Sequence, residues 1–150
     1  MDYYTKLNQK DARRTGIYDK IMGSLTKCPF CDLKEKYLIN DTGLCVLTVN
    51  LFPYTDGHML IIPKRHLENF EDLTDEEWDS IKTLINRAKQ KLKEKLKIDS
   101  FNILYNDGPK SGASLGHFHI QIIPADKEVL KKLYQQINMA PIELAKKLKD

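Results

Sequence analysis

The sequence predicts a domain in which antiparallel strands pack against one long helix. Two β-rich runs, 44–49 and 58–63, flank a turn-rich segment, which is typical of an antiparallel pair of strands. Apolar residues recur at steps of three and four across 74–97, which predicts a helix whose apolar stripe packs on the sheet. A further segment, 112–124, alternates in character and closes on a proline, as a strand does. A layer of strands covered by one helix accounts for all three patterns.

Length and composition are those of one globular domain. The chain has 150 residues and a mass of 17.4 kDa, long enough for one hydrophobic core and short for two. Apolar residues make up 41% of the chain, and no apolar run approaches the roughly 20 residues that a membrane helix requires. Residues 1–14 are charged and lack the apolar core of a secretion signal. We therefore expect a single domain over 1–150, located in the cytoplasm and without a membrane partner.

A short helix and a cysteine pair make up the N-terminal region. Residues 1–27 are polar, and apolar residues at helical spacing from Ile17 to Met22 predict one short helix. Cys28 and Cys31 follow as a C-P-F-C sequence, in which the proline fixes the backbone and lets both sulfurs face one point.

The cysteine pair has three interpretations. In a reducing compartment a C-x-x-C pair is typical of a metal half-site or a redox couple, and two ordinary core cysteines are the third possibility. A tetrahedral zinc site would need two more ligands. The candidates are the four histidines, His58, His66, His117 and His119. The remaining cysteine, Cys45, lies in an apolar run and is interpreted as a small buried hydrophobic residue.

The long helix carries its own start signal. Thr74 and Glu77 form a capping-box pattern, with Thr74 as the N-cap and Glu77 able to bond back to it. After this helix, 101–105 predicts another strand, and 106–115 a loop. Apolar residues beyond residue 126 predict C-terminal helices that cover an edge of the sheet or a partner.

Alternation in 112–124 sorts its side chains onto two faces. The polar face carries His117, His119 and Gln121, and the apolar face carries Phe118, Ile120 and Ile122. The preceding glycine-rich segment includes Gly112 and Ser114, whose backbone N–H groups and hydroxyl could close around a phosphate. The polar row could also be only a solvated strand face. Two histidines and a glutamine at period two, entered through G-A-S-x-G, favour the functional interpretation.

These motifs together resemble a known family. The sequence G-H-M-L-I-I-P-K-R-H at 57–66, followed by N-D-G-x-x-x-G-A-S-x-G-H-F-H-I-Q-I-I-P at 106–124, is similar to the histidine triad superfamily of nucleotidyl hydrolases and transferases. The resemblance covers roughly 28–124, with helical extensions at both ends. It implies an α+β fold in which an antiparallel sheet with one long helix pairs across a two-fold axis, so we expect a homodimer.

The third histidine of the usual triad is replaced by Gln121. This departure, with the G-A-S sequence, resembles the branch that includes galactose-1-phosphate uridylyltransferase and dinucleoside tetraphosphate phosphorylase. The small size and the C-x-x-C pair instead resemble the compact bacterial histidine triad proteins.

The resemblance implies a role for each matching residue. His119 would be the nucleophile that forms a nucleotidyl-histidine, and His58 the upstream histidine of the active site. Asn50 would hold the ribose, while Asn106 and Ser114, with Gly112 in the same loop, would contact the phosphates. A structural zinc would be held by Cys28, Cys31, His66 and His117, and no organic cofactor is expected.

The leading hypothesis is therefore an enzyme that cleaves dinucleoside polyphosphates or related nucleotides, by hydrolysis or phosphorolysis. Because Gln121 cannot transfer a proton, substrates with a leaving group of low pKa are favoured, which points to polyphosphates rather than phosphoramidates. The alternative is a nucleotide-binding or signalling module with little turnover. A zinc-stabilised nucleic-acid binder is disfavoured, because the net charge is only +3 and basic residues are interspersed with acidic ones.

Overall fold

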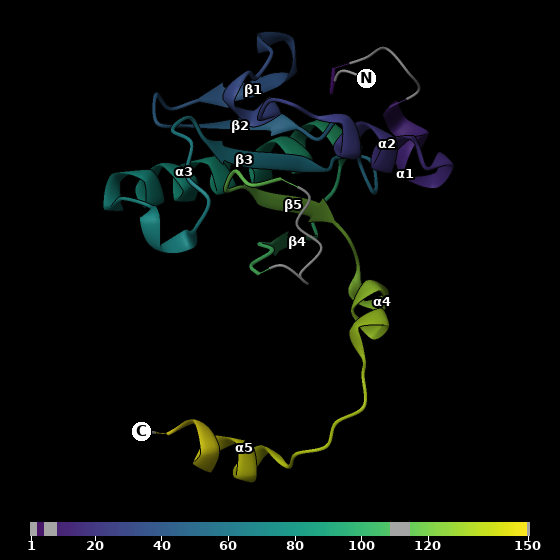
Figure 1. Ribbon diagram of the computed structural model, residues 1–150, viewed down its shortest axis with the longest axis vertical. Helices are drawn as coiled ribbons and strands as arrows, with labels where there is room; N and C mark the ends of the chain where they lie inside the picture. The colour runs from purple at the N-terminus through teal and green to yellow at the C-terminus, as the bar shows by residue number, and fades with distance from the viewer. Residues whose placement is uncertain (1–2, 5–8, 109–114, 150) are drawn as a thin grey trace.

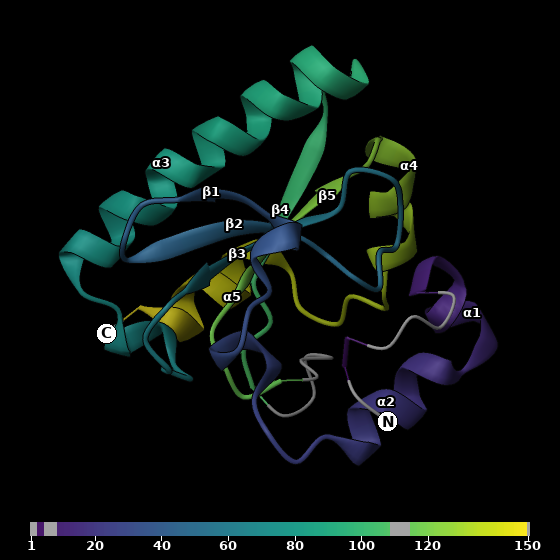
Figure 2. The ribbon, with the colours of Figure 1, turned by 90° about the horizontal axis from the view of Figure 1, so that it is seen from above.

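The computed structural model describes residues 3–4, 9–108 and 115–149. Five antiparallel strands form one sheet in the order β1-β2-β3-β5-β4, and helices lie on both of its sides (Figures 1 and 2). The strands are β1 (Leu38–Asp41), β2 (Cys45–Val49), β3 (Met59–Pro63), β4 (Phe101–Leu104) and β5 (Ile120–Pro124). The helices are α1 (Ala12–Thr15), α2 (Ile17–Ser24), α3 (Asp75–Lys91), α4 (Lys127–Leu130) and α5 (Pro141–Leu148). The chain thus has the α+β fold that its sequence predicts.

The predicted antiparallel pair is confirmed as β2 and β3, which pair from Cys45 with Pro63 to Val49 with Met59. All of β3 and all but the last residue of β2 are buried. Alternate side chains enter two cores: Leu47 and Ile61 pack toward α3, whereas their neighbours pack toward the N-terminal helices. Burial on both faces explains why these strands have continuous apolar sequences.

Helix α3 lies along one face of the sheet, opposite α1 and α2 (Figure 2). Its predicted capping box is present: Glu77 N–H donates to Thr74 Oγ1, and Thr74 N–H donates to Glu77 Oε1, both over 3.1 Å. The predicted apolar stripe is buried at Ile81, Leu84, Ala88 and Leu92.

The end of this helix differs from the prediction. Regular α-helix stops at Lys91, and a π-helical turn follows over Leu92–Leu96. Gly57, at φ 88°, lies against this turn, and a Cβ there would come within 2.9 Å of Leu92 Cδ2. The segment before β3 thereby packs closely on the C-terminal end of the helix.

The strand predicted over 112–124 begins only at Ile120. Before Ile120, the N–H of Phe118 donates to Leu67 O over 2.7 Å. The backbone there is thus hydrogen-bonded to the segment after β3 and not to a strand of the sheet. Alternation nevertheless persists through this irregular part, and Phe118, Ile120 and Ile122 are buried in the core under α3. Gly112 and Ser114 lie outside the described residues.

Two elements were missing from the prediction. β1 was not predicted, because it is a short edge strand of mixed polarity, and Asn40 and Asp41 favour turns. In the structure they belong to the strand, and the turn follows, with Gly43 N–H donating to Asp41 Oδ1 over 2.7 Å. The N-terminal helix predicted from Ile17 to Met22 is present as α2, and α1, which was not predicted, precedes it and ends at Gly16, whose φ is 77°.

The predicted C-terminal helices are present as α4 and α5, joined by an extended segment that carries α5 away from the sheet (Figure 1). In α5, Ile142 and Leu148 are 65% and 72% exposed, so this helix does not cover an edge of its own chain. Among the described residues, no helix is long and apolar enough to cross a membrane.

Candidate functional site

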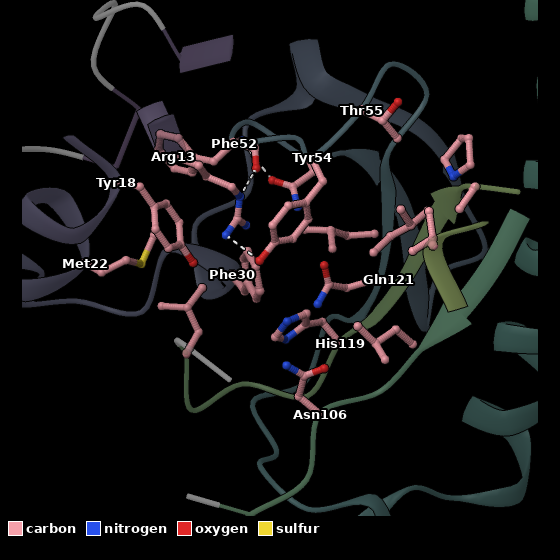
Figure 3. Close-up of a pocket in the computed structure, with 18 of the residues that line it drawn as sticks. Arg13, Tyr18, Met22, Phe30, Phe52, Tyr54, Thr55, Asn106, His119 and Gln121 are labelled. Carbon is pink, nitrogen blue, oxygen red and sulfur yellow. Dashed lines mark hydrogen bonds between the residues drawn. The ribbon is translucent and has the colours of Figure 1, made fainter. Parts of the chain in front are cut away.

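A cavity of about 710 Å³ opens on the side of the sheet that faces α1 and α2 (Figure 3). Its size is within the range of small-molecule sites, roughly 300–1,000 Å³. Aromatic and aliphatic side chains form most of the wall. Four polar residues that the sequence assigned to nucleotide chemistry also line it: Asn50, Asn106, His119 and Gln121. The structure therefore brings these residues from distant parts of the chain to one cavity.

His119 lies just before β5 and points into this cavity (Figure 3). Its Nδ1 is 2.9 Å from the carbonyl oxygen of His117, and a carbonyl can only accept, so Nδ1 carries the proton. The lone pair of neutral His119 is therefore on Nε2. Burial lowers the pKa of His119, which keeps the ring neutral near pH 7. This is the form in which imidazole acts as a nucleophile.

His58 fixes the orientation of Gln121. The backbone N–H of Tyr54 donates to His58 Nδ1 over 3.1 Å, so the proton of the neutral ring lies on Nε2. That nitrogen is 2.9 Å from Gln121 Oε1 and donates to it. The amide nitrogen of Gln121, which carries two N–H donors, is left at the other end of the group. Burial lowers the pKa of His58 to about 4, so the ring stays a neutral donor at physiological pH.

Asn50 packs beside this pair. Its Oδ1 accepts from Phe52 N–H over 2.8 Å, and its Nδ2 lies 3.2 Å from His58 Nε2. Asn50 therefore shapes the loop that follows β2 as well as lining the cavity. Asn106 lines the same cavity from the chain after β4.

The four predicted metal ligands, Cys28, Cys31, His66 and His117, form a second cluster. One sulfur or nitrogen atom from each lies within 4.8 Å of all the others. Sulfur–nitrogen separations are 3.4 Å from Cys28 to His117, 3.2 Å from Cys31 to His66 and 3.6 Å from Cys31 to His117. In a tetrahedral zinc site these atoms lie about 3.5 Å apart, given Zn–S and Zn–N bonds of about 2.3 and 2.0–2.1 Å. The donor set and its spacing fit zinc.

The buried histidine of this cluster is oriented for coordination. His117 Nε2 donates to Pro63 O over 2.8 Å, which leaves the lone pair of Nδ1 facing the cysteines. Metal-bound histidines typically donate the N–H of their other ring nitrogen to a hydrogen-bond acceptor, because this bond fixes the tautomer.

Sequence reasoning missed the contribution of the N-terminal helices to the cavity. Arg13 and Tyr18 line it from α1 and α2, and Tyr54 lines it from the loop before β3. No motif marks these residues, since their position depends on how α1 and α2 fold back over the sheet.

An α+β fold with an antiparallel sheet, and an H-x-H-x-Q segment whose second histidine lines a cavity, define a histidine triad type of protein. The HIT domain family matches residues 33–128, and the chain belongs to that family. It is 32% identical over 103 residues to an uncharacterized HIT-like protein of Mycoplasma genitalium, covering 66% of this chain and 73% of that one. A crystal structure of a HIT family member from Bacillus subtilis has the same fold, with a TM-score of 0.63 and 24% identity, covering 80% of this chain and 91% of that chain.

Two relatives have names that state an activity. The AP-4-A phosphorylase of Mycobacterium tuberculosis is 30% identical over 100 residues, covering 66% of this chain and 51% of that protein. The asymmetrical bis(5'-nucleosyl)-tetraphosphatase of Schizosaccharomyces pombe is 34% identical over 86 residues, covering 57% of this chain and 47% of that protein. The matched region thus spans about half the length of each of these two enzymes.

Proposed function

We propose that this protein is an enzyme that cleaves dinucleoside polyphosphates through a nucleotidyl intermediate on His119. The observation that carries the proposal is His119 itself: it lines the cavity, and its Nδ1 proton is held by a backbone carbonyl, which leaves Nε2 free to attack. Membership of the HIT family and similarity to a phosphorylase and a tetraphosphatase support this class of substrate.

The proposed reaction has two steps. His119 Nε2 attacks an α-phosphorus, a P–N bond forms, and the bond from phosphorus to the oxygen of the leaving nucleoside polyphosphate breaks. Water or inorganic phosphate then attacks the same phosphorus, the P–N bond breaks, and neutral His119 is released, while an attacking water gives its proton to the solvent. A polyphosphate leaves as a stable anion, so the lack of an acidic proton on Gln121 costs little.

Gln121 would stabilise the charge that develops on the phosphoryl oxygens. Its carbonyl oxygen already accepts from His58, so its N–H donors are available to a ligand in the cavity. His58 is then a positioning residue, since it acts through the orientation of the amide. Asn50 and Asn106 would contact the ribose and phosphates from the same wall.

A structural zinc at Cys28, Cys31, His66 and His117 belongs to the same proposal. Four protein ligands close the coordination sphere, so the metal would hold the fold together without binding substrate. It would join the N-terminal cysteine loop to the segment after β3 and to the chain just before β5. Because His117 and His119 are two residues apart, this cross-link would also fix the backbone that carries the nucleophile.

A homodimer is also part of the proposal. β4 is an edge strand, and its Ile103 and Leu104 are 49% and 43% exposed, an apolar edge that a second chain could cover. Light scattering at micromolar concentration should give twice the chain mass, and a monomer would contradict this.

Incubation with a panel of dinucleoside polyphosphates, with and without inorganic phosphate, tests the proposed activity. We expect cleavage to a mononucleotide and a nucleoside polyphosphate in one or both conditions, and the product with added phosphate identifies the acceptor. Binding of the whole panel without cleavage would contradict the proposal and favour a nucleotide-binding module.

A further inference from the structure

Arg13 is a charged residue of the cavity that the family match does not include. It lies in α1, outside the matched residues 33–128, yet it lines the same cavity as His119 and Gln121 (Figure 3). The described residues that line this cavity include no Asp or Glu, and their cationic side chains are Arg13 and Lys132. The cavity is therefore suited to an anionic ligand.

Neutral partners hold the guanidinium group in place. Arg13 Nε donates to Phe52 O over 2.5 Å, and Nη1 donates to the hydroxyl of Tyr54 over 3.0 Å. The guanidinium carbon also lies 4.1 Å from the ring centre of Tyr18 and 4.0 Å from that of Tyr54. Two aromatic rings and two hydrogen bonds thus fix the planar group before any ligand binds, which lowers the entropy cost of binding.

Among the described residues, Arg13 forms no ion pair with an Asp or Glu side chain. Its two hydrogen bonds use two of the five N–H donors of a guanidinium group. The remaining donors and the net charge match phosphate oxygens, which guanidinium groups bind through paired hydrogen bonds. Lys132 differs, because it is exposed on the C-terminal segment.

A chain of contacts places Arg13 next to the candidate catalytic residues. Tyr54, on which the guanidinium packs, stacks on the ring of His58 with centroids 5.7 Å apart and an angle of 21°. His58 in turn donates to Gln121 over 2.9 Å. Arg13 is therefore separated from the His58–Gln121 pair by one aromatic ring.

The wall formed by Arg13 and Tyr54 also borders a second cavity of about 450 Å³. This neighbouring cavity is lined by Lys10, Arg14 and two aspartates, Asp11 and Asp56, in addition to the shared residues. A ligand that extends past Arg13 thus has further space beyond the first cavity.

From this arrangement we propose that Arg13 binds the phosphates of the leaving group, and so determines the preference of the site for dinucleoside polyphosphates. The inference rests on the proposed function, because it assigns the leaving-group side of the same reaction. Nucleotides whose leaving group has no phosphate do not use Arg13.

Two substrates with the same nucleotidyl group separate this role from a structural one. Diadenosine tetraphosphate has phosphates in its leaving group, whereas the p-nitrophenyl ester of AMP does not. We expect Arg13→Ala to lower kcat/KM for the tetraphosphate about 10- to 100-fold, which is the size of the effect of losing a charge-assisted hydrogen bond. The same variant should lower kcat/KM for the ester less than about threefold. Arg13→Lys, which keeps the charge without the paired donors, should fall between Arg13→Ala and the wild type.

Arg87→Ala is the matched control, because Arg87 is an exposed arginine on α3 that bonds only to Gln90 in the described structure. It should leave both substrates unchanged. An equal loss on both substrates in Arg13→Ala, or no loss on the tetraphosphate, would overturn the proposal. Thermal melting of each variant shows whether the fold is retained, and Arg13→Lys keeps the test decisive if Arg13→Ala unfolds.

Calorimetric binding distinguishes this inference from the proposed function. If the wild type cleaves neither substrate, the proposed function fails, but Arg13 can still be tested with AMP and a methylene-bridged diadenosine tetraphosphate. Weaker binding of the bridged analogue alone in Arg13→Ala supports the inference. Equal changes in the binding of both ligands would contradict it.

Discussion

Backbone carbonyls decide which nitrogen two neighbouring histidines present. His117 gives its Nε2 proton to Pro63 O, and His119 gives its Nδ1 proton to the carbonyl of His117. Neutral rings two residues apart therefore present opposite nitrogens, Nδ1 to the cysteines and Nε2 to the cavity. The sequence identified both residues and their common face. It could not identify the tautomers, since these depend on carbonyls that the folded backbone positions.

At the same scale, His58 predicts a pH dependence of stability. Burial lowers its pKa to about 4 in the folded protein, against about 6.5 in the unfolded chain. As the pH falls below about 6.5, the unfolded chain binds the proton first, so the free energy of unfolding decreases until about pH 4. The full loss from this group is on the order of 3 kcal/mol.

Urea unfolding of the wild type and of His58→Asn at several values between pH 4 and 7 measures this contribution. The variant should show a flatter dependence over this window, while above about pH 6.5 neither protein should change because of this group. If the free energy of unfolding changes equally with pH in the two proteins, the pKa of His58 is not lowered by folding.

At the scale of elements, the sequence predicted those features that depend on residues close together in the chain. The capping box starts α3, and three- and four-residue periodicity marks the side chains that it buries. The start of β5 could not be predicted in this way, because alternation continues through His117 and Phe118 although the backbone there bonds to Leu67. The hydrogen-bond partners of a strand lie far away in the sequence, so a local pattern does not reveal where pairing begins. The edge strand β1 is too short and too polar for an alternation of polar and apolar residues to be detected.

Close packing between Gly57 and the end of α3 predicts unequal costs for two glycine substitutions. Gly57 and Gly43 both have positive φ, 88° and 93°, but a Cβ at Gly43 would meet nothing within 4 Å. Gly43→Ala should cost only backbone strain, about 1–2 kcal/mol. Gly57→Ala should cost more, by about 1–3 kcal/mol, because its Cβ would overlap buried Leu92 and the ring of Pro124.

Denaturant unfolding of the two variants gives the comparison directly. The midpoint for Gly57→Ala should be clearly lower than that for Gly43→Ala, with similar slopes. If both variants lose the same free energy of unfolding, the contact between Gly57 and the helix end is not tight.

On the scale of the whole molecule, the proposed zinc connects three distant parts of the chain. Cys28 and Cys31 contact His117 across 89 and 86 residues, so a metal there constrains long loops of the unfolded protein. Chelation should therefore lower the melting temperature, and elemental analysis should find one zinc per chain. Cys31→Ser should lose the metal, whereas Cys45→Ala should retain it, because Cys45 is buried under α3 away from the cluster. Zinc retained by Cys31→Ser, or stability unaffected by chelation, would contradict the site.

The sequence predicted this cluster once the resemblance had selected His66 and His117 among four histidines. It did not predict how the cavity is completed, because α1 and α2 bring Arg13 and Tyr18 to it from outside the matched region. Their placement follows from the packing of Ala12 and Ile21 in the core between the sheet and the N-terminal helices. This is a long-range contact that no sequence motif marks.

The central claim is that His119 becomes covalently nucleotidylated. Intact-mass measurement after brief incubation with a dinucleoside polyphosphate and rapid quenching tests it most directly. We predict an added mass of one nucleotidyl group on the wild type, lost on acid treatment as a phosphoramidate is, and absent from His119→Ala. His119→Ala should also lose turnover while still binding nucleotide, since the other cavity residues remain. Turnover of His119→Ala at the wild-type rate would contradict the account.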